Sequence, residues 1–199
     1  MPISLIKHAD GLMRCSWCGV LPDYMAYHDK EWGRPVHDDV RLYEKITLEG
    51  FQSGLSWITI LRKREAFREA FAGFDFYRVA AFDEQDILRL LANSGIVRHR
   101  GKIQAAINNA RCVCELIQSE GSLAEFVWKF KPDPAARPAS ITPEVAMGLT
   151  RSPESEALCA ALKKRGFKFV GPTTMYAFMQ SVGLVNDHLV GCSLQSQLG

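Results

Sequence analysis

Four cysteine and histidine side chains near the two ends of the sequence have the spacing of metal ligands. His188 and Cys192 lie four positions apart, which is one turn in a helix, and Cys15 and His28 can supply two further ligands. This set predicts a tetrahedral Cys2His2 zinc site with a structural role, tying the N-terminal segment to the C-terminal one. Cys18 leaves a second assignment open, because the Cys-x-x-Cys pair could replace His28 or serve redox chemistry. Buried thiols and a hydrogen-bonded imidazole are the simpler alternative.

The segment 165–174 is typical of a turn that binds phosphate. A helix that ends at Gly166, an apolar turn to Gly171 and a new helix from Pro172 or Thr173 would leave backbone N–H groups without partners. Lysine and arginine side chains flank this turn, so the backbone of a nucleic acid is the expected anion. An ordinary helical corner with solvated lysines is the alternative.

Glu49 is predicted to lie on the buried face of a helix. A helix that begins at Asp38 or Asp39 places Leu42, Ile46 and Glu49 on one side, where the pattern expects apolar residues. A carboxylate in that position is costly unless it is paired or faces a cavity. Glu49 is therefore either a paired structural acid or a group that reads a ligand.

Helices are predicted for almost the whole chain. N-cap residues begin them at Asp38 or Asp39, Ser56, Asp83, Ser122 and Ser152, and glycines end them at Gly50–Gly54, Gly95, Gly121 and Gly166. The prolines between Lys131 and Pro143 exclude a continuous helix and predict a surface loop. No run of residues alternates with the period of a strand, so the expected fold class is all-α.

Length and composition predict a globular protein. With 199 residues, of which 47% are apolar, the chain can bury a full core. We expect a flexible N-terminal extension over residues 1–13, a helical domain over 14–192, in one piece or as two packed subdomains with the pocket between them, and a C-terminal tail over 193–199.

Composition also bounds the setting in which the chain acts. No stretch is as long and apolar as a membrane span, and the first residues do not form a signal peptide, so we expect a cytoplasmic protein with no membrane partner. In that compartment the six cysteines indicate buried thiols or metal ligands and not disulfides. The net charge of +2 is too small to argue for nucleic acid by itself.

Six blocks of the sequence, read together, resemble the 3-methyladenine DNA glycosylase I family. The blocks are Arg14 to Trp17, Tyr27 to Gly33, Leu48 to Trp57, Gly95 to Ile103, Lys163 to Gly171 and Val185 to Cys192. The resemblance covers residues 14–192 and implies a helix-hairpin-helix fold, in which the segment 165–174 is the hairpin that grips DNA. It also implies a zinc ion on the residues matching Cys15, His28, His188 and Cys192, and leaves Cys18 outside the ligand pattern.

The resemblance further implies a pocket for a methylated base. Tyr27, Glu49 and Trp57 match the residues that line it, and Trp17 is a further wall. An aromatic pair can sandwich a cationic purine, while the Glu49 carboxylate, the assigned catalytic residue, accepts from its exocyclic amine. The residues implied to contact DNA are Gly54 and Leu55, which enter the stack left by the flipped base, and Lys168, Gly171 and Thr173 at the hairpin.

The implied activity is base flipping followed by hydrolysis of the N-glycosidic bond, without strand cleavage. The partners expected are double-stranded DNA containing alkylated bases and free 3-methyladenine as product, bound by a monomer. Asp187 follows the hairpin, where related families place a catalytic aspartate; its neighbour His188 makes a role beside the metal ligand the alternative. A non-catalytic, zinc-stabilised helix-hairpin-helix module and a zinc enzyme of another class are the competing functions.

Overall fold

The computed structural model describes residues 3–197 and is mostly helical, as the sequence predicts. None of the helices in this part of the chain is both long and apolar enough to cross a membrane. Four single 3-10 turns complete a set of two strands and ten helices: β1 (Leu5–Lys7), β2 (Met13–Cys15), α1 (Pro22–Lys30), α2 (Asp39–Gln52), α3 (Trp57–Ala70), α4 (Phe76–Ala80), α5 (Glu84–Ala92), α6 (Arg100–Glu120), α7 (Leu123–Trp128), α8 (Pro143–Gly148), α9 (Pro153–Lys164) and α10 (Pro172–Ser181).

The helix boundaries follow from capping side chains. Asp38 accepts a hydrogen bond from the backbone of Arg41, and Asp83 and Ser152 each form a capping box at the start of α5 and α9. Gly121 ends α6 with a φ of 89°, a conformation that favours glycine. These starts and stops confirm the predicted ones.

Gly50 does not break α2, contrary to our expectation. The helix continues to Gln52, and Gly54, with a φ of 83°, lies in the loop that follows. A Cβ atom on Gly50 would lie 3.3 Å from the Cβ of Phe169, in the turn between α9 and α10. Gly50 thus allows that turn to approach the helix closely, which is a role that a helical period does not reveal.

The N-terminal residues form a hairpin and not the loose extension that we expected. β1 pairs antiparallel with β2, with Leu5 opposite Cys15. The C-terminal segment also joins this unit, because the backbone N–H of Ser193 donates to the carbonyl of Met13 at 2.8 Å and Met13 donates to the Ser193 hydroxyl at 2.9 Å. Strands of three residues are too short to show alternation, so the pattern search missed them.

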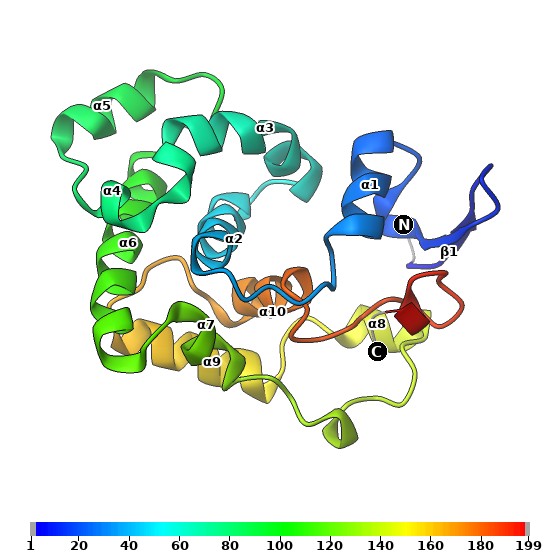
Figure 1. The fold of residues 1–199 in the computed structure, drawn as a ribbon. Helices are drawn as coiled ribbons and strands as arrows, with labels where there is room; N and C mark the ends of the chain where they lie inside the picture. Colours follow the sequence, from blue (N-terminus) through cyan, green and yellow to red (C-terminus); the bar gives the residue numbers. More distant parts are fainter. Residues whose placement is uncertain (1–2, 198–199) are drawn as a thin grey trace.

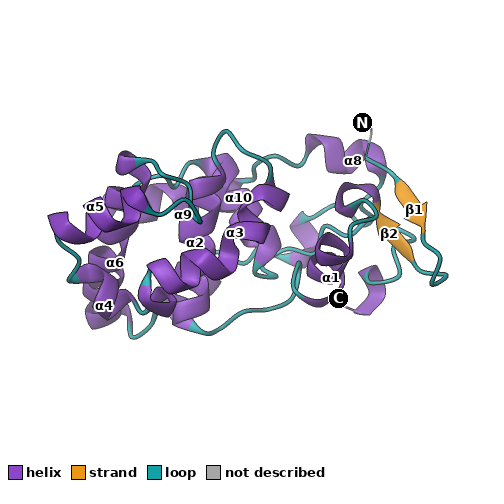
Figure 2. Cartoon of the chain, turned by 90° about the horizontal axis from the view of Figure 1, so that it is seen from above, coloured by secondary structure: helices purple, strands orange, loops and turns teal. Residues whose placement is uncertain are grey.

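The molecule has two hydrophobic clusters. The larger one surrounds α2 and includes buried side chains of α3 to α7, α9 and α10. The smaller one gathers Cys15, Ile141, Leu189, Cys192 and Leu194. In Figures 1 and 2 the α4–α6 region lies at one end of the molecule, and α1, α8, β1 and both termini lie at the other. The two ends of the chain therefore form one unit beside the helical body.

Candidate active site and metal centre

A cavity of about 540 Å³ lies between the terminal unit and the helical body. All four residues predicted to contact the base, Trp17, Tyr27, Glu49 and Trp57, line it. Tyr24 and Trp32 add two further aromatic rings, and Gln180 and Asp187 add polar groups. Aromatic walls with few polar groups are typical of a pocket for a flat, partly polar molecule.

Tyr27 and Trp57 form one continuous wall and not two facing plates. Their ring centroids lie 5.4 Å apart and the rings are tilted by 45°. A third ring between them would need roughly twice the spacing of an aromatic pair. The structure therefore offers a surface on which a base can stack, and the sandwich that we expected is not formed. Trp17 extends this wall, with its centroid 6.3 Å from that of Tyr27.

Glu49 faces the cavity without a partner. Its side chain comes from the last turns of α2 and is only 5% exposed. Among residues 3–197 no side chain or backbone group donates a hydrogen bond to the carboxylate. Burial raises the pKa of Glu49 to about 7, and the positive charge of Lys45 opposes this rise. Of the two interpretations of Glu49, the unpaired geometry favours a group that reads a ligand.

The cavity lies beside the loop that joins α2 to α3. A second hollow of about 270 Å³ is lined by this loop and the start of α10, and it shares Glu49, Gln52 and Ala177 with the cavity. Leu55 stands out from the loop with 42% of its surface exposed. Gly54, Leu55 and Thr173 thus border the same hollow, as sites on one DNA face would require.

Lys102 fixes this loop, and the sequence analysis missed it. Its buried ammonium group, on α6, donates to the carbonyl oxygens of Phe51 at 2.9 Å and Ser53 at 2.7 Å. These bonds satisfy carbonyl groups at the end of α2 that have no helical partner. Lys102 was not detected because its partners are backbone atoms some fifty positions away, which leave no mark in the local sequence.

The turn from Arg165 to Gly171 has the predicted shape. Gly166 adopts a φ of 86°, and α10 begins at Pro172, whose missing N–H is tolerated there. Asn109 on α6 holds the turn through two bonds with the backbone of Lys168, at 2.8 and 2.9 Å. The backbone N–H groups of residues 173 and 174 have no acceptor within the described chain. An anion seat is therefore available at this helix start.

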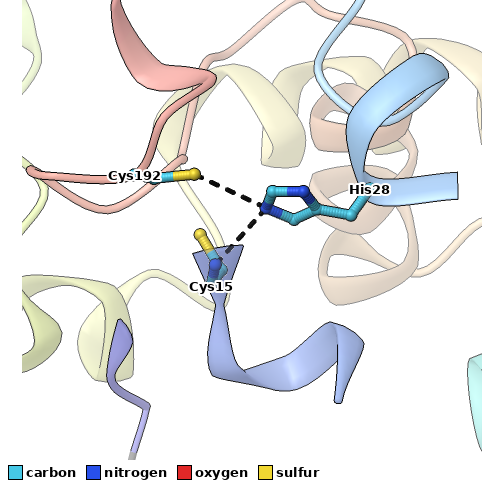
Figure 3. A group of neighbouring side chains, drawn as sticks. All are labelled: Cys15, His28 and Cys192. Atoms are coloured by element: carbon cyan, nitrogen blue, oxygen red, sulfur yellow. Dashed lines mark hydrogen bonds between the residues drawn. The ribbon is translucent and has the colours of Figure 1, made fainter. Parts of the chain in front are cut away.

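Three of the four predicted metal ligands meet. The ligand atoms of Cys15, His28 and Cys192 all lie within 4.8 Å of one another, and all three residues are buried (Figure 3). The Nδ1 of His28 bonds to the Asp29 carboxylate at 2.8 Å, and its Nε2 faces the Cys192 sulfur at 3.6 Å and accepts from the backbone N–H of Cys15 at 3.4 Å. Hydrogen bonding to Cys15 lowers the pKa of the Cys192 thiol. This donor set suits a thiophilic metal ion.

His188 lies beside this cluster without joining it. Its ring centroid is 4.9 Å from that of His28, and its Nδ1 bonds to the Asn186 side chain at 3.0 Å. Its Nε2 is buried and lacks a partner among the described residues. Burial lowers the pKa of His188 to about 4, so the imidazole is neutral and keeps a free lone pair. Cys18 is outside the cluster, and its sulfur approaches only the Gly19 carbonyl, at 3.7 Å.

Comparison with known proteins gives this geometry a family. A family model described as methyladenine glycosylase matches residues 17–195. The chain belongs to this family. It is 52% identical over 180 residues to the DNA-3-methyladenine glycosylase 1 of Escherichia coli (strain K12), covering 90% of this chain and 95% of the relative.

Two further comparisons agree with this membership of the methyladenine glycosylase family. The chain is 47% identical over 182 residues to a DNA-3-methyladenine glycosylase of Haemophilus influenzae, covering 90% of this chain and 96% of the relative. A crystal structure of 3-methyladenine DNA glycosylase I matches the fold with a TM-score of 0.84 at 52% identity. That match covers 90% of this chain and 98% of the other.

Lys45 is a second residue of this methyladenine glycosylase fold that the sequence analysis missed. It precedes Glu49 by one helical turn on α2 and is 3% exposed. Its ammonium group lies 4.7 Å from the ring centroid of Tyr27 and 5.6 Å from that of Trp57. The spacing of Lys45 and Glu49, typical of a charge pair on a helix, is a signal that could have found it.

Asp187 is a structural hub and does not orient a metal ligand. Its carboxylate accepts hydrogen bonds from Tyr176 and Gln180 of α10, each at 2.8 Å, and from Arg137 in the loop before α8. The contact to the His188 imidazole comes from Asn186 instead. Of the two roles left open for Asp187, the one beside the metal ligand finds no contact in the structure, because the Asp187 oxygens accept from three other donors.

The raised pKa of Glu49 gives a testable dependence of stability on pH. The carboxyl group binds its proton more tightly in the folded chain than at its ordinary pKa of 4.5, so its contribution is full below about pH 4.5 and is lost as pH rises to about 7. At pH 8 the free energy of unfolding of Glu49→Gln should therefore exceed that of the parent by roughly 1–3 kcal/mol, which raises its melting temperature, and the difference should shrink toward pH 5.

Glu44→Gln is the matched control for this measurement. Glu44 lies on the same helix and is equally buried, but it pairs with Arg68 at 2.9 Å. Removing that paired charge should lower stability at pH 8. The measurement is the melting temperature of the parent, Glu49→Gln and Glu44→Gln at several pH values. A Glu49→Gln protein that melts below the parent at pH 8 would identify Glu49 as a paired structural acid.

Proposed function

We propose that this chain is a DNA repair glycosylase that flips 3-methyladenine out of alkylated DNA and excises it by hydrolysis of the N-glycosidic bond. The observation that carries the proposal is the unpartnered Glu49 carboxylate in an aromatic-walled cavity. A flat base bearing positive charge and an exocyclic amine matches both features, since it can stack on the wall and donate to the carboxylate. The names of the relatives agree with this activity.

The chemistry asks little of the enzyme beyond binding. Methylation at N3 makes the base cationic, so when the bond from N9 to C1′ breaks, the electron pair moves to N9 and the base leaves as a neutral molecule. Water then adds to C1′ and releases a proton. The protein must hold the flipped base, exclude unmodified adenine and position the water. This agrees with a cavity in which Glu49 is the lining carboxylate without a hydrogen-bond donor, since Asp187 already accepts from three donors.

The DNA-binding face is proposed from two features that border the cavity. The α9–turn–α10 unit would act as the helix-hairpin-helix grip, with a phosphate on the free N–H groups near Thr173 and the exposed side chain of Lys168 beside it. Leu55 would enter the stack left by the flipped base, steadied by the contacts of Lys102 to the loop. Both features share the hollow that reaches Glu49.

A structural zinc ion fits the Cys15, His28 and Cys192 cluster. We propose His188 as the fourth ligand, because its buried Nε2 has no partner among the described residues and its ring lies next to that of His28. When bound, zinc would supply folding energy and no open coordination position. Trp17 contacts both His28 and Tyr27, so the ion would also support the aromatic wall.

A binding module without catalysis explains less of the structure. Such a module would need the hairpin and the basic turn, but it has no use for a cavity of about 540 Å³ that is lined by Tyr27, Glu49 and Trp57. The cavity therefore favours the enzyme. We further propose that residues 14–192 form the functional unit, with the terminal hairpin and the end of the chain packed onto it.

Release of 3-methyladenine from methylated double-stranded DNA, followed by chromatography in single turnover, tests this function. The parent protein should release the base, and Glu49→Gln should lose roughly 2–4 kcal/mol of transition-state stabilisation, because a charge-assisted buried hydrogen bond is removed. Glu44→Gln should keep the parent rate. A folded Glu49→Gln protein that releases the base at the parent rate would show that the base binds elsewhere.

Elemental analysis of protein purified without chelators tests the metal site. We expect one zinc ion per chain, and a chelator should lower the melting temperature because the ion joins the two ends of the chain. Cys15→Ser should lose zinc, whereas Cys18→Ser should retain it. Metal-free protein that is as heat-resistant as the untreated sample would refute the structural role, and the reverse pattern in the two variants would refute the ligand assignment.

Gly171→Asp tests the phosphate seat. Gly171 is the N-cap of α10, and a Cβ there meets only the Thr174 hydroxyl at 3.7 Å, so aspartate should fit and cap the helix well. Its charge would oppose a phosphate and weaken DNA binding by roughly 1–2 kcal/mol, more strongly at low salt. Gly171→Asn has the same shape without the charge and should bind nearly as the parent does. If both variants bound DNA as tightly as the parent, the turn would have only a structural role, packing α9 against α10.

A further inference from the structure

The ammonium group of Lys45 is buried without any hydrogen bond. Its side chain is 3% exposed, and Nζ has no hydrogen-bonding partner among residues 3–197. Its Nζ atom lies over the faces of two aromatic rings, those of Tyr27 and Trp57. Rings attract a cation, yet they replace only part of its lost hydration. A buried charge of this kind needs an opposite charge nearby.

Glu49 supplies that opposite charge through space. The two residues are one turn apart on α2, where side chains are neighbours, but no ion pair or hydrogen bond joins them. Glu49 lines the base cavity together with Tyr27 and Trp57, whereas Lys45 does not. The ammonium group therefore lies behind the aromatic wall, and the carboxylate lies in front of it.

The other acids that face Lys45 are already paired. Glu31, at the end of α1, binds Arg64 of α3 at 2.6 Å, and Glu44 of α2 binds Arg68 at 2.9 Å. On the side of Glu49, the ionisable groups that face it are Lys45 on its own helix and Tyr24 and Tyr27 on α1, and burial raises the pKa of both tyrosines. Lys45 is thus the cation whose charge stabilises the free carboxylate of Glu49.

We propose that Lys45 is a positioning residue for base recognition, whose buried ammonium group keeps the Glu49 carboxylate ionised from behind the aromatic wall. This inference rests on the proposed function for its role in catalysis. An ionised carboxylate accepts a hydrogen bond from the amine of the base, whereas a protonated one would turn an O–H donor toward that amine. The wall keeps the ammonium group itself out of the pocket, so it does not compete for the base.

The proposal predicts a specific change in the pH profile. Burial raises the pKa of Glu49 to about 7 while the charge of Lys45 holds it down. Without that charge the carboxyl group would stay protonated through neutral pH. Lys45→Met keeps an unbranched stem of similar size, so the acidic limb of the base-release rate should move to higher pH by about one unit or more. Above the shifted limb the rate should return to the parent value.

Single-turnover release of 3-methyladenine from pH 5.5 to 9 is the experiment. Lys45→Arg, which restores a cation, should return the limb toward that of the parent. Lys45→Met made in a Glu49→Gln background should cause no further shift. Lys129→Met removes a positive charge that pairs with Glu120 on the surface, and it should leave the profile unchanged. An unmoved limb in Lys45→Met, or an equal loss of rate at every pH, would overturn the proposal.

A second measurement separates this inference from the proposed function. The carboxyl carbon of Glu49 can be titrated by NMR in glutamate-labelled protein and assigned by its disappearance in Glu49→Gln. The midpoint should rise in Lys45→Met even if the parent releases no base, and in that case only the proposed function fails. An unchanged midpoint would refute the role of Lys45 directly. Lys45→Gln serves for both measurements if Lys45→Met does not fold.

Discussion

The site depends on one constraint, which is that α2 is buried on every side. Ten consecutive residues from Leu42 to Phe51 are buried, and three of them carry a charged side chain. Each charge is accommodated differently: Glu44 pairs with Arg68, Lys45 rests against two aromatic rings, and Glu49 faces a cavity. Because an unpaired charge in a core is costly, the cavity and the aromatic wall are the structural consequence of placing these residues in a central helix.

The same helix also sets the distance between the cavity and the proposed DNA face. Gly50 admits the turn between α9 and α10, and the end of α2 passes into the loop of Leu55, whose backbone is held by Lys102. One rigid element therefore carries the carboxylate, the seat for the turn and the base of the exposed loop. Recognition of a flipped base would require these three parts to keep fixed positions relative to one another. The helix α2 is uninterrupted between them.

Local signals were enough to predict most of the helices, but not α1, α4 and α8, nor the contacts between the helices. Capping residues such as Asp38 and Asp83 act within one turn, so the sequence shows them directly. The hairpin at Leu5 and Met13 was missed because its strands are too short for a pattern.

The residues of the candidate site also differ in whether a local signal in the sequence could predict them. The position of Glu49 on a buried face follows from helical period, but Trp17, Tyr27 and Trp57 were found through family resemblance and have no local pattern of their own. The four cysteine and histidine ligands were proposed from their spacing at each end of the sequence. Whether they meet depends on tertiary packing, which brings three of them together and leaves the His188 ring beside them, with its centroid 4.9 Å from that of His28. The spacing of Lys45 and Glu49 could have pointed to Lys45, but the two rings that cover its ammonium group become visible only in the fold.

The union of the two ends has a consequence for how the protein is made. Residues 15 and 28 leave the ribosome well before their partner at 192. Since chains fold as they emerge and contacts of long sequence separation form late, the helical body can assemble while the aromatic surface of α1 is still uncovered. The pocket therefore takes its final form only after residue 192 has been synthesised and has packed against residues 15 and 28.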